Sequence, residues 1–203
     1  MRIERIFRRA ARYRVEVDMR CLVALAALLL AGCCVPSLEP LYTSQDTLFD
    51  PALLGAWREV TDEPDKADWF LATRRGPYSY RIVHGGEDSA SIFTARLVQI
   101  GRHRFLDLYP DKPSTPTGFY NDHLWRTHTF GRIDLEGNRL AFHMFNGAWF
   151  KTEAGQASGL EFRTNGDETL LTAPTARLRH IAERYAEDGP FSVTSTWMRE
   201  PAQ

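Results

Sequence analysis

The most reactive side chains in this sequence are three cysteines near the N-terminus, at positions 21, 33 and 34. A thiolate can act as a nucleophile, and thiols can also pair in disulfides. Cys33 directly follows an apolar run, Leu22 to Ala31 plus Gly32, and Arg20 precedes that run. A bilayer core requires about 20 apolar residues, so a run this short is typical of an export signal.

The four residues Leu30-Ala31-Gly32-Cys33 resemble the lipobox, at which the lipoprotein signal peptidase of bacteria cleaves. The resemblance implies cleavage between Gly32 and Cys33 and an anchor to membrane lipid through acyl chains on Cys33. Two or more chains anchor firmly, because each buried methylene contributes about 0.8 kcal/mol. We therefore predict a signal peptide at residues 1–32. Translation from Met19 would give it an ordinary length, without the six arginines that precede Met19.

The residue after the acylated cysteine bears on the choice of membrane. In proteobacterial lipoproteins an aspartate at this position favours retention in the inner membrane, and here the residue is Cys34. The resemblance thus predicts a location in the cell envelope. It favours the outer membrane, facing the periplasm, over the inner membrane in a Gram-negative cell. Cys34 has no second cysteine to pair with in the folded part, so the core must stabilise the domain.

The charge of the chain argues against nucleic acid as a partner. The first 32 residues hold seven of the 25 basic and three of the 26 acidic residues, so residues 33–203 carry a formal charge of −5. Nucleic-acid-binding domains usually have a clear excess of basic residues. The length of residues 33–203 suits one domain with its own core.

Motifs for catalysis, metals and cofactors are absent from the sequence. It contains no His-x-x-x-His, Cys-x-x-Cys, Gly-x-Ser-x-Gly, P-loop or dinucleotide fingerprint. We therefore predict no catalytic residue, no metal site, no cofactor and no enzyme. One alternative places His143 across a hairpin from His128, with an acidic residue completing a metal site. The sequence leaves two directions open for the Asp107 side chain. It could face solvent, or it could point into a barrel, where it would require an arginine or tyrosine partner or a ligand.

The elements that must position these residues are mostly strands. Alternating apolar residues with turn residues between them predict an antiparallel β-barrel or sandwich of about eight strands. One helix follows at residues 174–187, with an apolar stripe that must cover the barrel wall. The predicted strands span residues 55–60, 68–73, 78–84, 91–100, 103–109, 124–135, 139–150, 159–163, 168–172 and 191–198.

Leu54-Gly55-Ala56-Trp57 resembles the Gly-x-Trp signature at the first strand of lipocalins and other calycins. The order of elements is also similar, although the Thr-Asp-Tyr motif of that family is absent. The resemblance implies a calycin-like barrel in which Trp57 closes one end and stacks on an arginine near the last strand or the helix. We predict Arg177 or Arg179 as that arginine. Residues 37–57 also resemble a group of bacterial lipoproteins, a likeness that implies no activity.

Two functions remain open at this stage. A barrel of eight strands can hold one small ligand or fill with its own side chains. The first hypothesis is a membrane-anchored lipoprotein that binds a small apolar ligand or lipid. The alternative is a structural or assembly lipoprotein with a filled barrel and a protein partner of unknown identity. We predict a tether at residues 33–50 and a single barrel domain at 51–203. The aromatic residues predicted to line a cavity are Trp69, Tyr80, Phe93, Phe105, Trp125 and Phe142.

Overall fold

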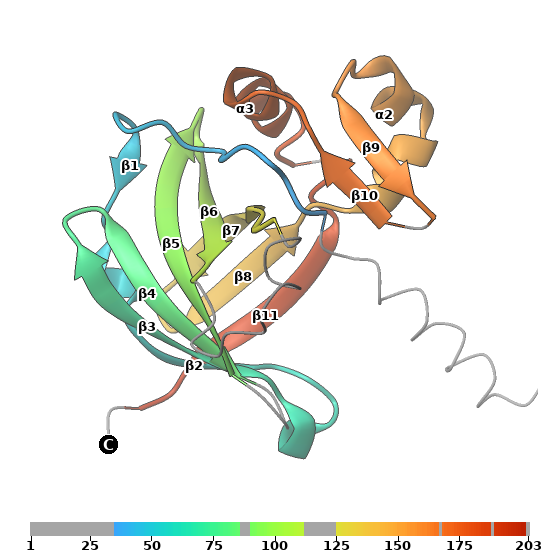
Figure 1. Cartoon of the computed structure of the whole chain (residues 1–203). Helices are drawn as coiled ribbons and strands as arrows, with labels where there is room; N and C mark the ends of the chain where they lie inside the picture. Colours follow the sequence, from blue (N-terminus) through green and yellow to red (C-terminus); the bar gives the residue numbers. More distant parts are fainter. Residues whose placement is uncertain (1–34, 86–89, 112–124, 167, 188, 202–203) are drawn as a thin grey trace, which may run out of the picture. The chain divides into compact units, whose positions relative to one another are not determined.

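Eight antiparallel strands close into a barrel in the computed structural model of this chain (Figure 1). The structure describes residues 35–85, 90–111, 125–166, 168–187 and 189–201. The predicted fold class, a mainly β antiparallel barrel of about eight strands with one C-terminal helix, is confirmed. Its strands are β2 (Gly55–Glu59), β3 (Trp69–Gly76), β4 (Ser79–Gly85), β5 (Ala90–Ile100), β6 (His103–Pro110), β7 (Thr129–Glu136), β8 (Arg139–Met144) and β11 (Val193–Arg199).

The path of the chain around the barrel is simple. From β2 to β8 each strand pairs with the next one in sequence, and β11 pairs with both β8 and β2. The predicted last strand is therefore the eighth strand of the barrel. The short β1 (Thr47–Leu48) lies beside the second half of β5, beyond the end of β4. The short helices η1 (Pro51–Leu53) and η2 (Pro64–Lys66) precede β2 and β3.

A long insertion separates β8 from β11. It contains η4 (Gly147–Lys151), α2 (Glu153–Ala157), β9 (Phe162–Asn165), β10 (Glu168–Leu171) and α3 (Thr175–Arg184). The strand pair predicted at 159–163 and 168–172 exists, but β9 and β10 form a separate two-stranded sheet outside the barrel. The strand predicted at 139–150 ends at Met144, because residues 147–151 turn into η4.

Alternation along the strands gives the barrel two apolar faces, because successive side chains point to opposite sides. The inner core lies inside the barrel, and Trp57, Tyr80 and Leu97 are its most buried large members. The turn at Gly137 shows the alternation: Leu140 and Phe142, two residues apart in β8, both face inward, and Phe142 was predicted to do so. The inner core consists of Leu53, Trp57, Phe70, Ala72, Tyr80, Ile82, Ala95, Leu97, Leu106, Ile133, Leu140 and Trp197.

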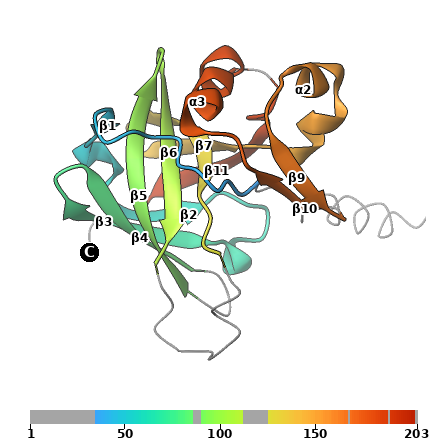
Figure 2. The same cartoon turned by 45° about the horizontal axis from the view of Figure 1, so that its top comes forward.

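The outer core lies between the barrel wall and the insertion (Figure 2). Helix α3 covers this side of the barrel with Leu178, Ile181 and Ala182, the face that the predicted stripe identifies. The outer core consists of Val35, Leu41, Val98, Ile100, Phe105, Phe130, Phe145, Trp149, Phe150, Leu160, Leu171, Ala173, Leu178, Ile181, Ala182, Ala186 and Phe191.

Residues 35–46, named here the N-terminal strap, run from beside β10 to β1 across the outside of the barrel (Figure 1). Val35 and Leu41 are 3% and 0% exposed and belong to the outer core. The prediction of a tether at residues 33–50 is therefore wrong from Val35 onward, because this segment is packed as part of the domain. In the described part of the chain, no helix combines the length and apolarity needed to cross a bilayer.

Candidate functional site

Trp57 closes one end of the barrel, which we call the proximal end. Its side chain is fully buried, and its indole Nε1 donates a hydrogen bond to the Leu53 carbonyl at 3.1 Å. The ring stacks on Phe70 with centroids 5.9 Å apart. The guanidinium carbon of Arg199 lies 4.3 Å from the Trp57 ring centroid. Because Arg199 is partly exposed, this cation–π contact contributes about 0.5–1 kcal/mol.

Gly55 is required at its position for two reasons. Its φ is +120°, a backbone conformation that other residues rarely adopt. A Cβ atom there would also lie 2.9 Å from a guanidinium nitrogen of Arg199. That guanidinium donates hydrogen bonds to the carbonyls of Ala52 and Leu54, which fixes η1 over the barrel end.

Arg199 occupies the position that the sequence analysis gives to Arg177 or Arg179, so that prediction is wrong. Both predicted arginines belong to α3, which lies outside the barrel and cannot reach its interior. Arg179 donates to the Leu41 carbonyl at 3.3 Å and pairs with Asp46 at 2.6 Å. The family resemblance allowed an arginine in the last strand, and Arg199 ends β11.

Tyr80 completes the proximal end. The Asp50 backbone N–H donates to the Tyr80 hydroxyl at 2.6 Å, and the hydroxyl donates to the Asp50 carbonyl at 3.2 Å. The Tyr80 ring stacks on Phe49 with centroids 5.0 Å apart. Burial raises the pKa of the Tyr80 hydroxyl above its ordinary value. Tyr80 thus faces the interior, as predicted, and its contacts hold the segment before η1.

We call the opposite end of the barrel the distal end; here β2, β4, β6 and β8 finish and the other four strands begin. Phe93, Leu108 and Phe142 pack against the inner core, and each of them is only half-buried. Leu97 and Ala95, deeper in the same core, are 1% and 0% exposed. Phe93 and Phe142 were both predicted to line the interior, and both face it.

Three titratable side chains gather at the distal end on the side of β2, β3 and β4. His84 Nε2 lies 3.5 Å from a carboxylate oxygen of Asp68, and the His84 ring meets Trp197 edge-on at 6.0 Å. The pKa of Glu59 is raised, first by burial and second by the negative charge of Asp68. These groups offer hydrogen-bond acceptors beside the apolar side chains of the distal end.

Three residues predicted to line the cavity lie elsewhere. Phe105 belongs to the outer core and meets Phe191 edge-on, because its neighbour Leu106 takes the inward position. Trp125 is 82% exposed. Trp69 packs over Gly85, while the next residue in β3, Phe70, joins the inner core.

The sequence analysis missed Phe70, Leu106, Leu108 and Trp197 as interior residues. Alternation was the available signal, because all four lie within predicted strands, at 68–73, 103–109 and 191–198. Where successive residues of a strand are both apolar, the sequence does not show which of them points into the barrel.

Asp107 is buried on the outer side of the barrel wall, beneath the N-terminal strap. One carboxylate oxygen accepts a hydrogen bond from the Leu41 backbone N–H at 2.8 Å, and the other lies 2.7 Å from His128 Nδ1. The His128 ring packs against Tyr109 with centroids 4.6 Å apart. Neither position left open for Asp107 is correct, since the side chain points neither into the barrel nor to solvent.

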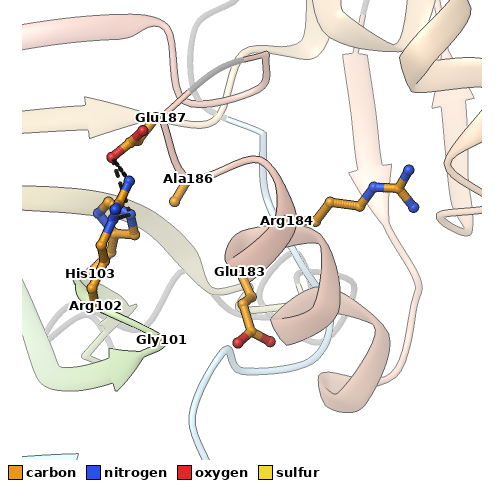
Figure 3. A pocket seen from close by; sticks show the side chains of 7 residues that line it. All are labelled: Gly101, Arg102, His103, Glu183, Arg184, Ala186 and Glu187. Atoms are coloured by element: carbon orange, nitrogen blue, oxygen red, sulfur yellow. Dashed lines mark hydrogen bonds and ion pairs between the residues drawn. The ribbon is translucent and has the colours of Figure 1, made fainter.

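Two hollows lie on the outer wall among the described residues. The first has a volume of about 290 Å³ and is polar. Figure 3 shows Arg102 and His103 turned toward Glu187, while Glu183 and Arg184 point elsewhere. Arg102 donates to the Glu187 carboxylate, and His103 Nε2 lies 3.6 Å from the same oxygen. These ion pairs join the β5–β6 turn to the end of α3.

His143 lies in the second hollow, which has a volume of about 480 Å³. Its ring nitrogens lie 2.8 Å from Thr194 Oγ1 and 2.8 Å from an Asp134 carboxylate oxygen. Burial lowers the pKa of His143, and the positive charge of Arg132 lowers it further. Arg132 is the residue opposite His143 in the β7–β8 pair, so His143 does not face His128 across this hairpin. Among the described residues, no cluster of His, Cys, Asp and Glu is arranged to hold a metal ion.

Cys33 and Gly32 lie outside the described residues, as does all of the predicted signal peptide. Comparisons of the chain with protein-family models, with curated proteins and with solved structures find no match. The function is therefore argued from the chemistry of the sequence and the geometry of the barrel.

Proposed function

We propose that this chain is a membrane-anchored lipoprotein whose barrel binds a small apolar ligand at its distal end. The anchor is supported by the Leu30-Ala31-Gly32-Cys33 motif and the short apolar run before it. The ligand site is supported by Phe93, Leu108 and Phe142, which are half-buried at the distal end. Phe49, Leu54 and Leu135 are half-buried near the proximal end, but there Tyr80 and Arg199 hold the segment around η1 over the interior.

The half-buried apolar side chains carry the argument for a ligand. Binding sites for small molecules are mostly apolar and contain a few polar groups that orient the ligand. The distal end offers both, since Glu59, Asp68 and His84 lie at this end and the His84 ring meets Trp197 of the inner core edge-on. Covering these apolar side chains with a ligand would contribute roughly 25 cal/mol for each Å² removed from water.

Replacing Cys33 tests the anchor. Cys33→Ser should leave an uncleaved precursor without acyl chains, which mass spectrometry and gel mobility would show. The matched control is Cys34→Ser, which should be cleaved and acylated normally because Cys34 does not accept the lipid. Normal maturation of Cys33→Ser would refute the proposed anchor.

Native mass spectrometry of the protein purified from its host tests the ligand. We expect an additional bound mass, and displacement of a fluorescent fatty acid by the same ligand. Leu108→Gln should weaken binding because Leu108 packs at the distal end, whereas Leu71→Gln, 39% exposed, should not. Thermal unfolding of both variants shows that they are folded. Equal binding by the two variants, or no bound ligand, would contradict the proposal.

A protein partner is the second candidate function, and one observation favours it. Leu71, Val83 and Ile92 are paired in register across β3, β4 and β5, and they form an apolar row. Leu71 and Ile92 are 39% and 37% exposed. If the barrel serves as an assembly module, Leu71→Gln should abolish crosslinking to a partner in the cell envelope, and Leu108→Gln should leave it unchanged.

A further inference from the structure

Val35, the first residue that the structure describes and two positions after Cys33, lies close to the distal end of the barrel. We propose that the anchor turns the distal end toward the bilayer, so that the ligand is the acyl chain of a membrane lipid rather than a water-borne molecule. This inference rests on the proposed acylation of Cys33 and on the proposed ligand site.

The first step is the short distance between the acylated residue and the folded core. Val35 is 3% exposed and belongs to the outer core. Two residues of chain span at most about 7 Å, so Cys33 must lie within that distance of Val35. A domain attached in this way cannot move far from the membrane or turn freely above it.

The second step is the set of backbone hydrogen bonds that fix the start of the strap. Ser37 and His128 exchange two hydrogen bonds, each 2.8 Å long. On the other side, the Leu38 N–H donates to the Leu171 carbonyl at 3.0 Å, and the Leu171 N–H donates to the Pro36 carbonyl at 2.8 Å. The strap is thus held between the segment before β7 and strand β10, and Val35 cannot leave the domain unless these bonds break.

The third step places this attachment at the distal end. Val35 lies against Gly147, since a Cβ on Gly147 would be 3.3 Å from a Val35 methyl. Gly147 follows Met144, the last residue of β8, and β8 finishes at the distal end. His128 precedes Thr129, the first residue of β7, and β7 begins at the distal end. Both contacts therefore place the start of the strap beside the barrel end that contains Phe93, Leu108 and Phe142.

The charges near the attachment indicate that the acyl chains, and not the lipid head groups, supply the affinity for the membrane. In η4, α2, β9 and β10 the charged side chains are Lys151, Glu153, Arg163 and Glu168, all exposed and two of each sign. Recognition of anionic lipid requires a cluster of basic residues. Residues 59–68 at the distal end carry five acidic side chains and one lysine, so we expect the orientation to be weaker on vesicles of anionic lipid than on vesicles of zwitterionic lipid.

Quenching of fluorescent labels tests the orientation. The acylated protein in a Cys34→Ser background is reconstituted in phosphatidylethanolamine–phosphatidylglycerol vesicles that contain a lipid with a nitroxide on its head group. Asp65→Cys places a label in η2 at the distal end, and Tyr78→Cys places one in the turn at the other end of β3. Strand β3 has eight residues and separates the two positions by about 26 Å.

We expect severalfold stronger quenching at position 65 than at position 78. A flexible insert of about 12 residues between positions 34 and 35 should abolish the difference, because its average span of about 20 Å lets the domain turn. Equal quenching at both positions in the chain of natural length, or stronger quenching at position 78, would overturn the orientation.

The identity of the ligand is tested on the same vesicles. One phospholipid in them carries a fluorescent acyl chain, and its transfer into the barrel is measured before and after the flexible insert. We expect the insert to slow transfer severalfold and Leu108→Gln to abolish it. Transfer that is unchanged by the insert would contradict a supply from the bilayer. If Cys33 were not acylated, the protein would instead be missing from the vesicles. If the barrel bound no ligand, the orientation would persist without transfer.

Discussion

The inner and outer cores of this domain are built in different ways. The inner core draws one or two buried residues from each barrel strand, and of its buried members in the described chain only Leu53 comes from outside the strands. The outer core combines residues of the N-terminal strap, three barrel strands, the insertion and α3. The comparison shows that alternation along consecutive strands is enough to place apolar side chains inside the barrel. Covering the outer wall requires segments that lie far apart in the sequence.

The two cores nevertheless share strands. Leu97 and Val98 are neighbours in β5, and they are 1% and 0% exposed in different cores. Phe105 and Leu106 divide in the same way in β6. We therefore expect the two cores to unfold together, because a strand cannot lose one of its faces without disturbing the other.

Trp57→Ala is expected to have the largest effect. Removing a fully buried tryptophan should lower the free energy of unfolding by about 3–5 kcal/mol. Urea unfolding monitored by far-UV circular dichroism measures this loss. Backbone amide hydrogen exchange in α3, which covers the outer core, should become faster by an amount that corresponds to the same loss. Exchange in α3 that remains as slow as in the wild type would show that the two cores unfold separately.

Asp107→Asn is expected to cost about 1.5–3 kcal/mol, because a buried charged acceptor of two hydrogen bonds becomes neutral. Asp134→Asn is the matched control. Asp134 is 48% exposed, so the loss of its ion pairs should cost less than about 1 kcal/mol. Equal losses in urea unfolding would mean that the strap contributes no more to stability than a surface ion pair does.

Gly55→Ala should cost about 1–3 kcal/mol, since it combines an unfavourable φ with crowding of Arg199. Gly137→Ala isolates the effect of the backbone. Gly137 also has a positive φ of 58°, but a Cβ there would meet nothing within 4 Å. Its cost should be about 1–2 kcal/mol. A larger loss for Gly137→Ala than for Gly55→Ala would contradict the role assigned to Arg199.

His143 should give the outer wall a pH-dependent stability of modest size. Its pKa in the folded state lies below the ordinary value of 6.5, so as the pH falls the unfolded chain takes up the proton first. Its contribution to stability is therefore present above pH 6.5 and is lost as the pH falls below 6.5 toward the folded pKa. His143→Gln should make the free energy of unfolding less dependent on pH in this window, as urea titrations at several pH values would show.

Glu59, at the distal end, should make the free energy of unfolding depend on pH in the opposite direction, and its effect should be the smallest. Its pKa in the folded state lies above 4.5, so the folded chain holds its proton more tightly. This contribution is present below pH 4.5 and is lost as the pH rises through the folded pKa. Glu59→Gln should therefore be slightly more stable than the wild type at pH 7 in thermal unfolding. A destabilised variant would show that the carboxylate is well accommodated.

Most of the barrel could be predicted from the sequence. The strand predicted at 78–84 corresponds to β4, and Leu140 and Phe142 face inward as their spacing indicates. Strands β9 and β10 were also expected, but alternation does not reveal which sheet a strand joins, and these two lie outside the barrel.

The candidate site was harder to predict than the fold. Arg199 could not be distinguished from Arg177 and Arg179 by type or position, because all three follow the first seven barrel strands. Phe105 was assigned to the interior because it is aromatic, although alternation with Leu106 gives it the outer face. No local sequence pattern predicts that the strap packs on Asp107, since Leu41 and Asp107 are 66 residues apart.

The strap also determines when folding can finish. Its contacts reach across most of the chain: Thr175 donates to the Pro40 carbonyl and Arg179 to the Leu41 carbonyl, over separations of 135 and 138 residues. Contacts between such distant partners slow folding, because the entropy of closing a long loop is lost before the contact forms. The strap precedes the barrel strands in the chain and must wait for α3, which follows seven of them. It therefore cannot complete its contacts until Thr175 and Arg179 have reached it.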